Sequence, residues 1–287
     1  MEIQSLNKDN RKPRLIVADV DGTLTNDDRI MSEYTKGIFE RLHKEGYLLG
    51  IASGRPLEKW MIEKYDEWEL SFRFDFIIGL NGGQIWLKED DKVYDFSFLP
   101  KEAVARIAEI MKPYFDKVSM QVYNRGLLQS NRLDELTNDS IARNEMNIEI
   151  VPTEVITASK QSKIMFRGFE EDVAEASEYS KQFDCEEFHS FKTHPQMLEF
   201  QDPKASKGDT LKKYCELHNI DTEEVWAFGD MTNDISLLEA SGRGVCMLNG
   251  TDDIKAIADD ITEYDNNEDG FARYIDKHLF QEELWQK

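Results

Sequence analysis

The chain has 287 residues, and its 57 Asp and Glu outnumber its 35 Lys and Arg to give a formal charge of −22. A nucleic-acid or anionic-membrane binder needs a basic surface, so this acidity argues against both partners. With 40% hydrophobic and 11% aromatic residues the chain is too apolar to be disordered, and its length suits one large domain or two modest ones.

Three cysteines, Cys185, Cys215 and Cys246, are too widely spaced for a disulfide framework or a zinc site. Free thiols are typical of a reducing compartment. The polar stretch 1–14 has no apolar core, and no run approaches the length of about 18 apolar residues that spans a membrane. We therefore expect a cytoplasmic protein with neither a signal peptide nor a membrane span.

The first part of the chain alternates apolar runs with amphipathic segments. The predicted elements are strands at 15–18, 48–52 and 76–78, and helices at 32–45 and 57–65. Ser32 stands where a helix N-cap is expected, and Gly46 is a natural stop. Continuous apolar strands joined through helices predict a parallel sheet with right-handed crossovers.

The middle of the chain follows another pattern, and the end returns to the first. The middle elements are helices at 101–115 and 170–183 and strand-like segments at 119–123, 127–130, 148–151 and 163–167. The last elements are helices at 207–217, 235–240 and 254–258, and strands at 225–228, 244–247 and from 261. We therefore predict an α/β fold, a doubly wound parallel sheet formed by 1–84 and 190–287, with an inserted α+β domain at 85–189.

The strongest chemical signal directly follows the first strand. The run there is Asp19-Val20-Asp21-Gly22-Thr23-Leu24. Ligands of open α/β sheets bind just outside the carboxyl ends of the strands, which is where Asp19 and Asp21 stand. Gly22 permits a tight turn that offers backbone N–H groups. A pair of Asp residues in a loop is by itself ordinary turn chemistry, so their position after a buried strand is what makes them candidates.

Two helix starts also point to an anion. The second strand ends at Ser53 and Gly54, whose hydroxyl and N–H could hold a phosphate oxygen, although the same pair is an ordinary helix cap. Lys207 lies at the start of a helix, where a positive charge is unfavourable to the helix dipole. A nearby anion would explain this lysine, and a solvated surface position would explain it equally well.

A second acidic cluster follows the fourth strand. Its run is Gly229-Asp230-Met231-Thr232-Asn233-Asp234. Asp230 and Asp234 are four positions apart, so one helical turn aims both the same way. Four acids converging on one sheet edge would repel one another unless a cation lay between them, and oxygen ligands without His or Cys suit Mg²⁺. A capped helix start is the alternative, but it does not explain why two strands end in the same kind of cluster.

Taken in this order, the four segments resemble the haloacid dehalogenase (HAD) superfamily of phosphotransferases. The insert after the third strand resembles the type-II cap of its Cof-type branch, and the stretches 81–83, 244–249 and 258–270 also fit that branch. The resemblance implies a Rossmann-like core and a cap domain that recognises the leaving group. It also implies a Mg²⁺-dependent phosphatase that hydrolyses small phosphorylated metabolites, sugar phosphates above all, through an aspartyl-phosphate intermediate.

The resemblance also implies a role for each matching residue. Asp19 would be the nucleophile, already ionised at its ordinary pKa of about 3.9. Asp21 would be the general acid and then the base, with a pKa raised by burial under a closed cap. Lys207 would bridge Asp19 and the phosphate. Mg²⁺ would be held by Asp19, Asp230 and the Asp21 carbonyl, with Asp234 acting through water or as an orienting residue. The implied phosphate- and substrate-binding residues are Gly22, Thr23, Ser53, Gly54, Arg55, Asn81 and Asn233.

Specificity would lie in the cap, and rival functions stay open. The candidate cap residues for reading the substrate are Asn124, Arg125, Arg132 and Lys163. One alternative function is a phosphomutase acting on a sugar phosphate. The other is a non-catalytic phosphometabolite-binding protein. The expected partner in every case is a small phosphorylated metabolite, and the sequence carries no signal for the oligomeric state.

Overall fold

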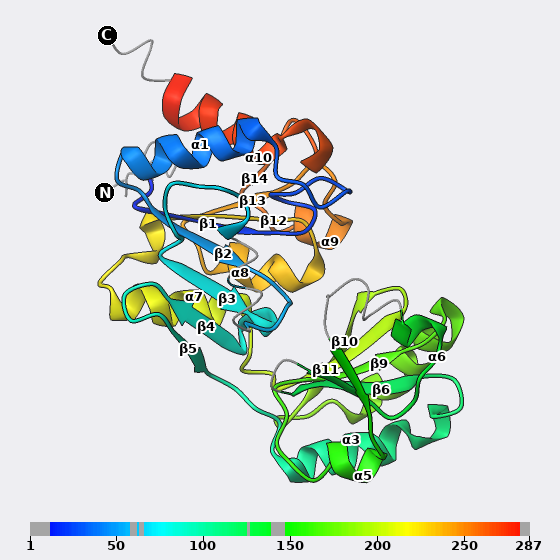
Figure 1. Cartoon of the computed structure of the whole chain (residues 1–287). Coiled ribbons are helices and arrows are strands. Elements are labelled where there is room, and N and C mark those ends of the chain that lie inside the picture. Colours follow the sequence, from blue (N-terminus) through cyan, green and yellow to red (C-terminus); the bar gives the residue numbers. More distant parts are fainter. Residues whose placement is uncertain (1–11, 58–61, 63–65, 125–126, 139–146, 282–287) are drawn as a thin grey trace, which may run out of the picture. The chain divides into compact units, whose positions relative to one another are not determined.

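The computed structural model describes residues 12–57, 62, 66–124, 127–138 and 147–281. The chain divides into two compact units (Figure 1). The core unit comprises Met1–Tyr94 and Ser206–Lys287, and the insert unit comprises Asp95–Ala205. No helix in the described part of the chain is long and apolar enough to cross a membrane.

The core unit is built on a mainly parallel sheet. The described residues form eight strands in the order β14-β13-β12-β1-β2-β3-β4-β5. Neighbours from β14 to β3 run parallel, and β4 pairs with β3 in the antiparallel direction. The strands are β1 (Leu15–Asp19), β2 (Leu48–Ala52), β3 (Phe76–Gly79), β4 (Gln84–Leu87), β5 (Lys92–Asp95), β12 (Val225–Gly229), β13 (Arg243–Cys246) and β14 (Asp260–Ile261).

Helices cover both faces of this sheet, as a doubly wound core requires (Figure 1). In β1, Ile16 and Ala18 belong to one apolar cluster, and Leu15 and Val17 belong to the other. The first cluster includes residues of α1 (Glu33–Lys44) and α10 (Gly270–Ile275), and the second includes residues of α7 (Lys207–Leu217) and α8 (Ile235–Glu239). The continuous apolar run of β1 is therefore explained by burial on both faces, and the predicted fold class is confirmed.

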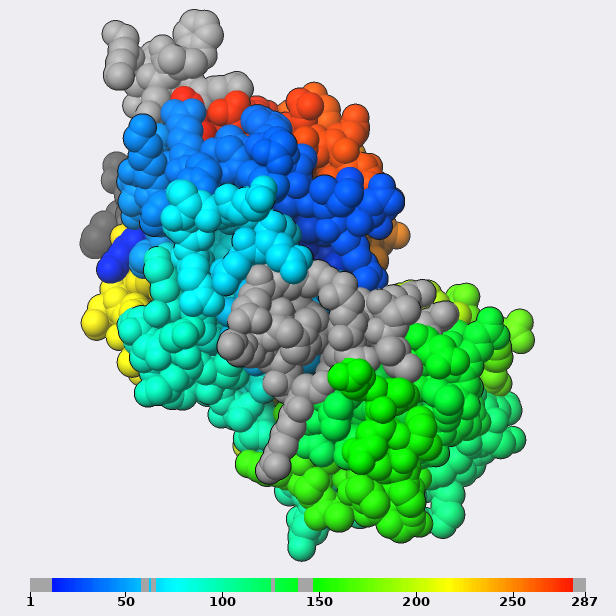
Figure 2. Space-filling view, in the orientation of Figure 1, coloured from blue at the N-terminus to red at the C-terminus, as the bar shows by residue number. Residues whose placement is uncertain are grey.

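Side-chain caps fix where two of these helices begin. Ser32 accepts a hydrogen bond from the backbone N–H of Thr35 at 3.0 Å and so starts α1, as predicted. Ser206 does the same for Asp209 at 3.0 Å, which makes Lys207 the first residue of α7. The helix expected over 57–65 falls largely outside the described residues. In Figure 2, blue atoms of the early described part of the core unit lie beside red and orange atoms of its last described part, in agreement with the packing of α1 against α10.

The insert unit is an α+β unit with its own sheet. Its described strands run in the order β10-β11-β9-β6-β7-β8. Apolar residues of α3 and α6 share one buried cluster with residues of β6, β9 and β11. The strands are β6 (Ser119–Asn124), β7 (Leu127–Ser130), β8 (Asn147–Ile150), β9 (Ile164–Arg167), β10 (His189–His194) and β11 (Met197–Gln201), and the helices are α3 (Lys101–Met111), α5 (Thr153–Ile156) and α6 (Glu170–Ser180). A further short helix, α9 (Asp252–Lys255), belongs to the core unit.

The unit boundaries fall later in the chain than the expected 85 and 189. The expected start lies inside β4, which pairs with β3 and so belongs to the core unit. The expected end lies at the start of β10, which pairs with β11, while β11 pairs with β9 of the insert. Strand pairing therefore decides both boundaries, and composition does not reveal it.

Candidate active site

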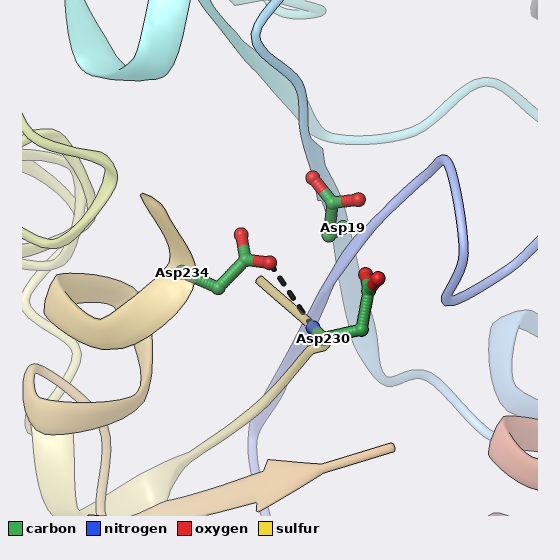
Figure 3. Close-up of side chains that lie close together, drawn as sticks. All are labelled: Asp19, Asp230 and Asp234. Carbon is green, nitrogen blue, oxygen red and sulfur yellow. Dashed lines mark hydrogen bonds between the residues drawn. The ribbon is translucent and has the colours of Figure 1, made fainter. Parts of the chain in front are cut away.

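Three carboxylates from two strand ends meet at one edge of the core sheet. Asp19 ends β1, Asp230 directly follows β12, and Asp234 closes the 3₁₀ turn Thr232–Asp234. One oxygen from each of the three lies within 4.8 Å of the others, and all three residues are buried. Figure 3 shows the side chains pointing toward a common space. The parallel pairing of β1 with β12 puts both carboxyl ends on the same edge.

Lys207 lies within hydrogen-bond distance of two of these carboxylates. Its Nζ donates to Asp19 Oδ1 and to Asp234 Oδ1, the latter at 2.5 Å, and its side chain is fully buried. Burial alone would lower the pKa of Lys207, but the adjacent charges of Asp19 and Asp234 raise it above its ordinary value. The interpretation of Lys207 as a solvated surface residue is therefore wrong. The lysine starts a helix because two anions surround its ammonium group.

Both oxygens of Asp234 are already engaged. Oδ1 accepts from Lys207, and Oδ2 accepts from the backbone N–H groups of Asp230 and Met231 at 3.1 Å each. These contacts fix the loop that carries Asp230. Of the two roles expected for Asp234, the geometry favours that of an orienting residue.

Asp230 is held by the loop that follows β1. Its Oδ1 accepts from the hydroxyl of Thr23 at 2.9 Å in a buried contact. Gly22 adopts a φ of +83°, and a Cβ there would lie 2.5 Å from Asp230 Oδ2. Glycine is needed at this position because the turn is left-handed and because it packs directly against the carboxylate.

The buried cluster has more negative than positive charge. Burial, followed by the charge of Asp234, raises the pKa of Asp230 to about 7. The same two causes raise the pKa of Asp19 well above its ordinary value, although Lys207 opposes them. Without a cation, the buried cluster therefore raises the pKa of Asp19 above the ordinary value expected for it. The donors are oxygen atoms, and the carboxylates exceed Lys207 by two charges, so the residues fit a hard divalent cation such as Mg²⁺.

Asp21 lies apart from the buried cluster and pairs with Arg55. Arg55 Nη2 is 2.9 Å from both carboxylate oxygens of Asp21, whose side chain is 45% exposed. Burial of Asp21 under a closed cap stays a prediction. The pair places a guanidinium next to the predicted general acid, at the same sheet edge.

Four of the predicted phosphate-binding residues lie together where three loops meet, and the backbone N–H of Asn81 donates to the Ser53 carbonyl at 3.2 Å. Ser53 is buried, and its hydroxyl accepts from the backbone N–H of Arg55 at 3.1 Å, as a cap would. Asn233 Nδ2 donates to Asn81 Oδ1 at 3.1 Å, and a Cβ on Gly54 would lie 3.0 Å from the same oxygen. Asn81 has a φ of +53°, a strained conformation for a residue other than glycine that occurs often at functional sites.

The insert unit uses two of its four candidate residues in internal contacts. Arg132 donates to the backbone carbonyls of residues 115–117 and pairs with Asp134 at 2.9 Å. Lys163 is buried and pairs with Glu199 at 2.8 Å. Asn124 ends β6, and Arg125 lies outside the described residues. Arg132 therefore has a structural role in the insert.

Two residues that the sequence argument did not single out also contact the site. Asn249 and Asn266 donate hydrogen bonds to backbone carbonyls of the loop that carries Asp21. They are 227 and 241 positions away from their partners. The sequence shows only that 244–249 and 258–270 fit the Cof-type branch, and no local pattern indicates this contact.

Comparison with known proteins assigns the arrangement to a family. The family model of the haloacid dehalogenase-like hydrolases matches residues 16–275. The 5-amino-6-(5-phospho-D-ribitylamino)uracil phosphatase YitU of Bacillus subtilis (strain 168) is 28% identical over 272 residues, which cover 93% of this chain and 98% of the relative. The phosphoglycolate phosphatase of Methanopyrus kandleri is 27% identical, over 92% of this chain and 97% of its own.

Solved structures agree with this match. The crystal structure of a haloacid dehalogenase-like hydrolase from Bacteroides thetaiotaomicron superposes with a TM-score of 0.80. It is 28% identical in sequence, and the superposition covers 93% of this chain and 99% of that one. The likeness therefore extends over both units of the chain.

Proposed function

We propose a function for this chain from the family to which it belongs, the haloacid dehalogenase-like hydrolases, and from its being a phosphoric monoester hydrolase. It uses Mg²⁺ to hydrolyse small phosphorylated metabolites, with sugar phosphates as the leading class. We propose that the reaction runs through an aspartyl-phosphate on Asp19. The three free thiols support a reducing, cytoplasmic location.

One observation carries the proposal. Asp19, Asp230 and Asp234 form a buried group of carboxylates at the strand ends where α/β sheets bind ligands, and the Lys207 ammonium contacts two of them, Asp19 and Asp234. Burying charge in excess is costly unless a partner offsets it. A divalent cation held by Asp19, Asp230 and the Asp21 carbonyl would offset it, and when bound it would also polarise a phosphoryl oxygen.

The first step transfers the phosphoryl group to Asp19. The Asp19 carboxylate attacks phosphorus in line with the leaving oxygen, the bond from phosphorus to that oxygen breaks, and Asp21 gives the departing alkoxide a proton. Lys207 lies against Asp19 and offsets negative charge in the transition state. Ser53 and Asn233 hydrogen-bond the phosphoryl oxygens. The products are the free alcohol and an acyl phosphate on Asp19.

The second step returns the enzyme to its starting state. Asp21, now a carboxylate, takes a proton from a water molecule as that water attacks phosphorus. The bond between phosphorus and Asp19 breaks, and inorganic phosphate leaves. Arg55 beside Asp21 is suited to contact a phosphoryl oxygen once substrate is present, because its guanidinium is already at this edge.

The substrate class rests on the names of the relatives. YitU is named for a substrate with a phosphate on a ribityl chain, and the Methanopyrus relative for phosphoglycolate. Both are small phosphate esters of aliphatic alcohols. These names support an aliphatic phosphate ester here, and sugar phosphates are the proposed members of that class.

The proposal is tested by phosphate release from p-nitrophenyl phosphate and from a panel of sugar phosphates and nucleotides. We expect turnover with Mg²⁺, its loss in EDTA, and a fall of at least about a thousandfold in Asp19→Asn. Asp221→Asn is the matched control, because it makes the same change at a helix cap outside the cluster and Asn also caps.

The outcomes separate the alternatives. Robust turnover by Asp19→Asn contradicts the nucleophile assignment. Phosphate release from a sugar phosphate without an acceptor sugar argues against a phosphomutase. Tight binding with no turnover across the panel would instead support the non-catalytic binding protein. A preference for nucleotides over sugar phosphates would overturn the substrate class alone.

A further inference from the structure

The loop that carries Asp21 is bridged by two asparagines from the last part of the chain. Asn249 Nδ2 donates to the carbonyl of Gly22 at 2.8 Å. Asn266 Nδ2 donates to the carbonyl of Thr25 at 3.1 Å, in a buried contact. The backbone N–H of Asn266 donates to Asn249 Oδ1 at 3.1 Å, so the two asparagines are bonded to each other. The bridge therefore joins two carbonyls of the loop, both of which closely follow Asp21 in the chain.

The hydrogen bonds within the loop use the carbonyl of Val20, whereas the asparagines bond to the carbonyls of Gly22 and Thr25. The backbone N–H groups of Leu24 and Thr25 donate to the carbonyl of Val20 at 3.0 and 3.1 Å, and the Thr25 hydroxyl donates to it as well. These contacts close the turn around Val20. The carbonyl groups of Gly22 and Thr25 instead accept from Asn249 and Asn266, and both lie within the turn just after Asp21.

An amide side chain is required at position 249. Asn249 uses its nitrogen as a donor to Gly22 and its oxygen as an acceptor from Asn266. A carboxylate offers no donor, and an apolar side chain offers neither group. Asn266 is buried, and its Nδ2 also lies 3.1 Å from Asp27 Oδ1, so it holds the loop at a second point.

We infer that Asn249 and Asn266 are positioning residues for Asp21, holding its loop so that the carboxyl group meets the leaving oxygen of the substrate. The inference rests on the proposed function, in which Asp21 is the general acid. Proton transfer requires the two oxygens to be within hydrogen-bond distance, and a small misplacement of a catalytic group costs a large factor in rate.

The leaving group provides a readout that a merely structural role would not move. An alkoxide leaving from a sugar or glycerol phosphate needs a proton as the bond breaks, whereas p-nitrophenolate leaves without one. The value of kcat/KM reports the steps up to the phospho-enzyme, in which Asp21 acts as the acid. Loss of positioning therefore lowers kcat/KM for the alkyl ester more than for p-nitrophenyl phosphate.

The experiment compares both substrates in Asn249→Ala, Asn266→Ala, Asp21→Asn and the wild type, all with saturating Mg²⁺. Asn249 is exposed, so its replacement leaves the core packing intact even if Asn266→Ala fails to fold. Tyr274→Phe is the matched control, because it removes a 2.8 Å hydrogen bond to Asp260 in the same unit and touches neither asparagine. Thermal unfolding of each variant is recorded alongside.

We expect Asn249→Ala to lower kcat/KM about tenfold for glycerol phosphate and less than about twofold for p-nitrophenyl phosphate. Tyr274→Phe should leave kcat/KM unchanged for both substrates, even where its loss of thermal stability is similar to that of Asn249→Ala. Equal losses on both substrates, or no loss on either, overturn the inference. If Asp21→Asn itself shows no dependence on the leaving group, the general-acid assignment in the proposed function fails instead.

Discussion

Binding of Mg²⁺ is expected to weaken steeply as the pH falls below 7. Burial, followed by the charge of Asp234, raises the pKa of Asp230 to about 7, and the same causes raise that of Asp19 above its ordinary value. A cation held by these carboxylates needs both of them ionised, so protons compete with it in this range. The neighbouring acids thereby set the pH range in which the site can load.

The magnitude follows from linkage. Below its pKa, each carboxylate that must lose a proton lowers the apparent Mg²⁺ affinity about tenfold per pH unit. A fall of about one pH unit therefore weakens Mg²⁺ binding about tenfold if only Asp230 titrates, and about a hundredfold if Asp19 titrates as well. The stability of the cation-free protein changes with pH in the opposite direction to the Mg²⁺ affinity. A carboxyl whose folded-state pKa is raised stabilises the fold below its ordinary pKa, and that stability is lost as the pH rises through about 7. For Asp230 the rise corresponds to about 4 kcal/mol.

The assay is calorimetric titration with MgCl₂ at pH 6, 7 and 8, in two buffers of different ionisation enthalpy so that released protons are counted. We expect release of about one proton or more at pH 6 and little at pH 8. The gap in unfolding midpoint between Mg²⁺-loaded and Mg²⁺-free protein should widen with pH. Asp221→Asn should behave like the wild type. An affinity that changes less than about twofold from pH 6 to 8, without proton release, would refute the reasoning.

Three substitutions extend the test to the residues around the cluster. Lys207→Met removes the ammonium from two buried carboxylates, which lowers the free energy of unfolding by about 3–5 kcal/mol. The thermal unfolding midpoint in EDTA should fall by about 10 °C, and an unchanged midpoint would contradict this prediction. Gly22→Ala puts a Cβ against Asp230 in a left-handed turn. Calorimetry should show Mg²⁺ affinity reduced at least about tenfold. Wild-type affinity would mean that the loop accommodates the methyl group without moving Asp230. Arg55→Ala removes a partly exposed ion pair, so the free energy of unfolding should change by less than about 1 kcal/mol. The value of kcat/KM for phosphate esters should fall about tenfold. A loss of stability without a loss of rate would show that Arg55 is a structural residue and not a substrate-binding one.

Local sequence patterns predicted the elements that carry the site. The apolar run 48–52 is β2, and the helix predicted at 207–217 is α7. Each signal lies within a dozen residues, because a strand buried on both faces needs a continuous apolar run and a helix needs a cap and a periodic face. The strand ends then follow, since parallel strands bring Asp19 and Asp230 to one edge.

Strand pairings and contacts between distant segments were not predictable in this way. The pairing of β4 with β3 moved one unit boundary, and that of β10 with β11 moved the other. The burial of Lys207 and the bonds from Asn249 and Asn266 also depend on where the last part of the chain packs. The catalytic roles stay predictions, because substitution kinetics are needed to test them.

The order of strands in the core sheet has a consequence for synthesis of the chain. β1 is flanked by β2, which follows it closely, and by β12, which is made roughly 200 residues later, about 10–40 s at ordinary translation rates. One edge of a strand that is apolar from Leu15 to Ala18 stays open during that interval. The contiguous insert unit is complete before β12 emerges. A nascent or truncated chain ending before Lys207 carries the predicted nucleophile without any of its buried partners, and the cluster is complete only once Asp234 has been made.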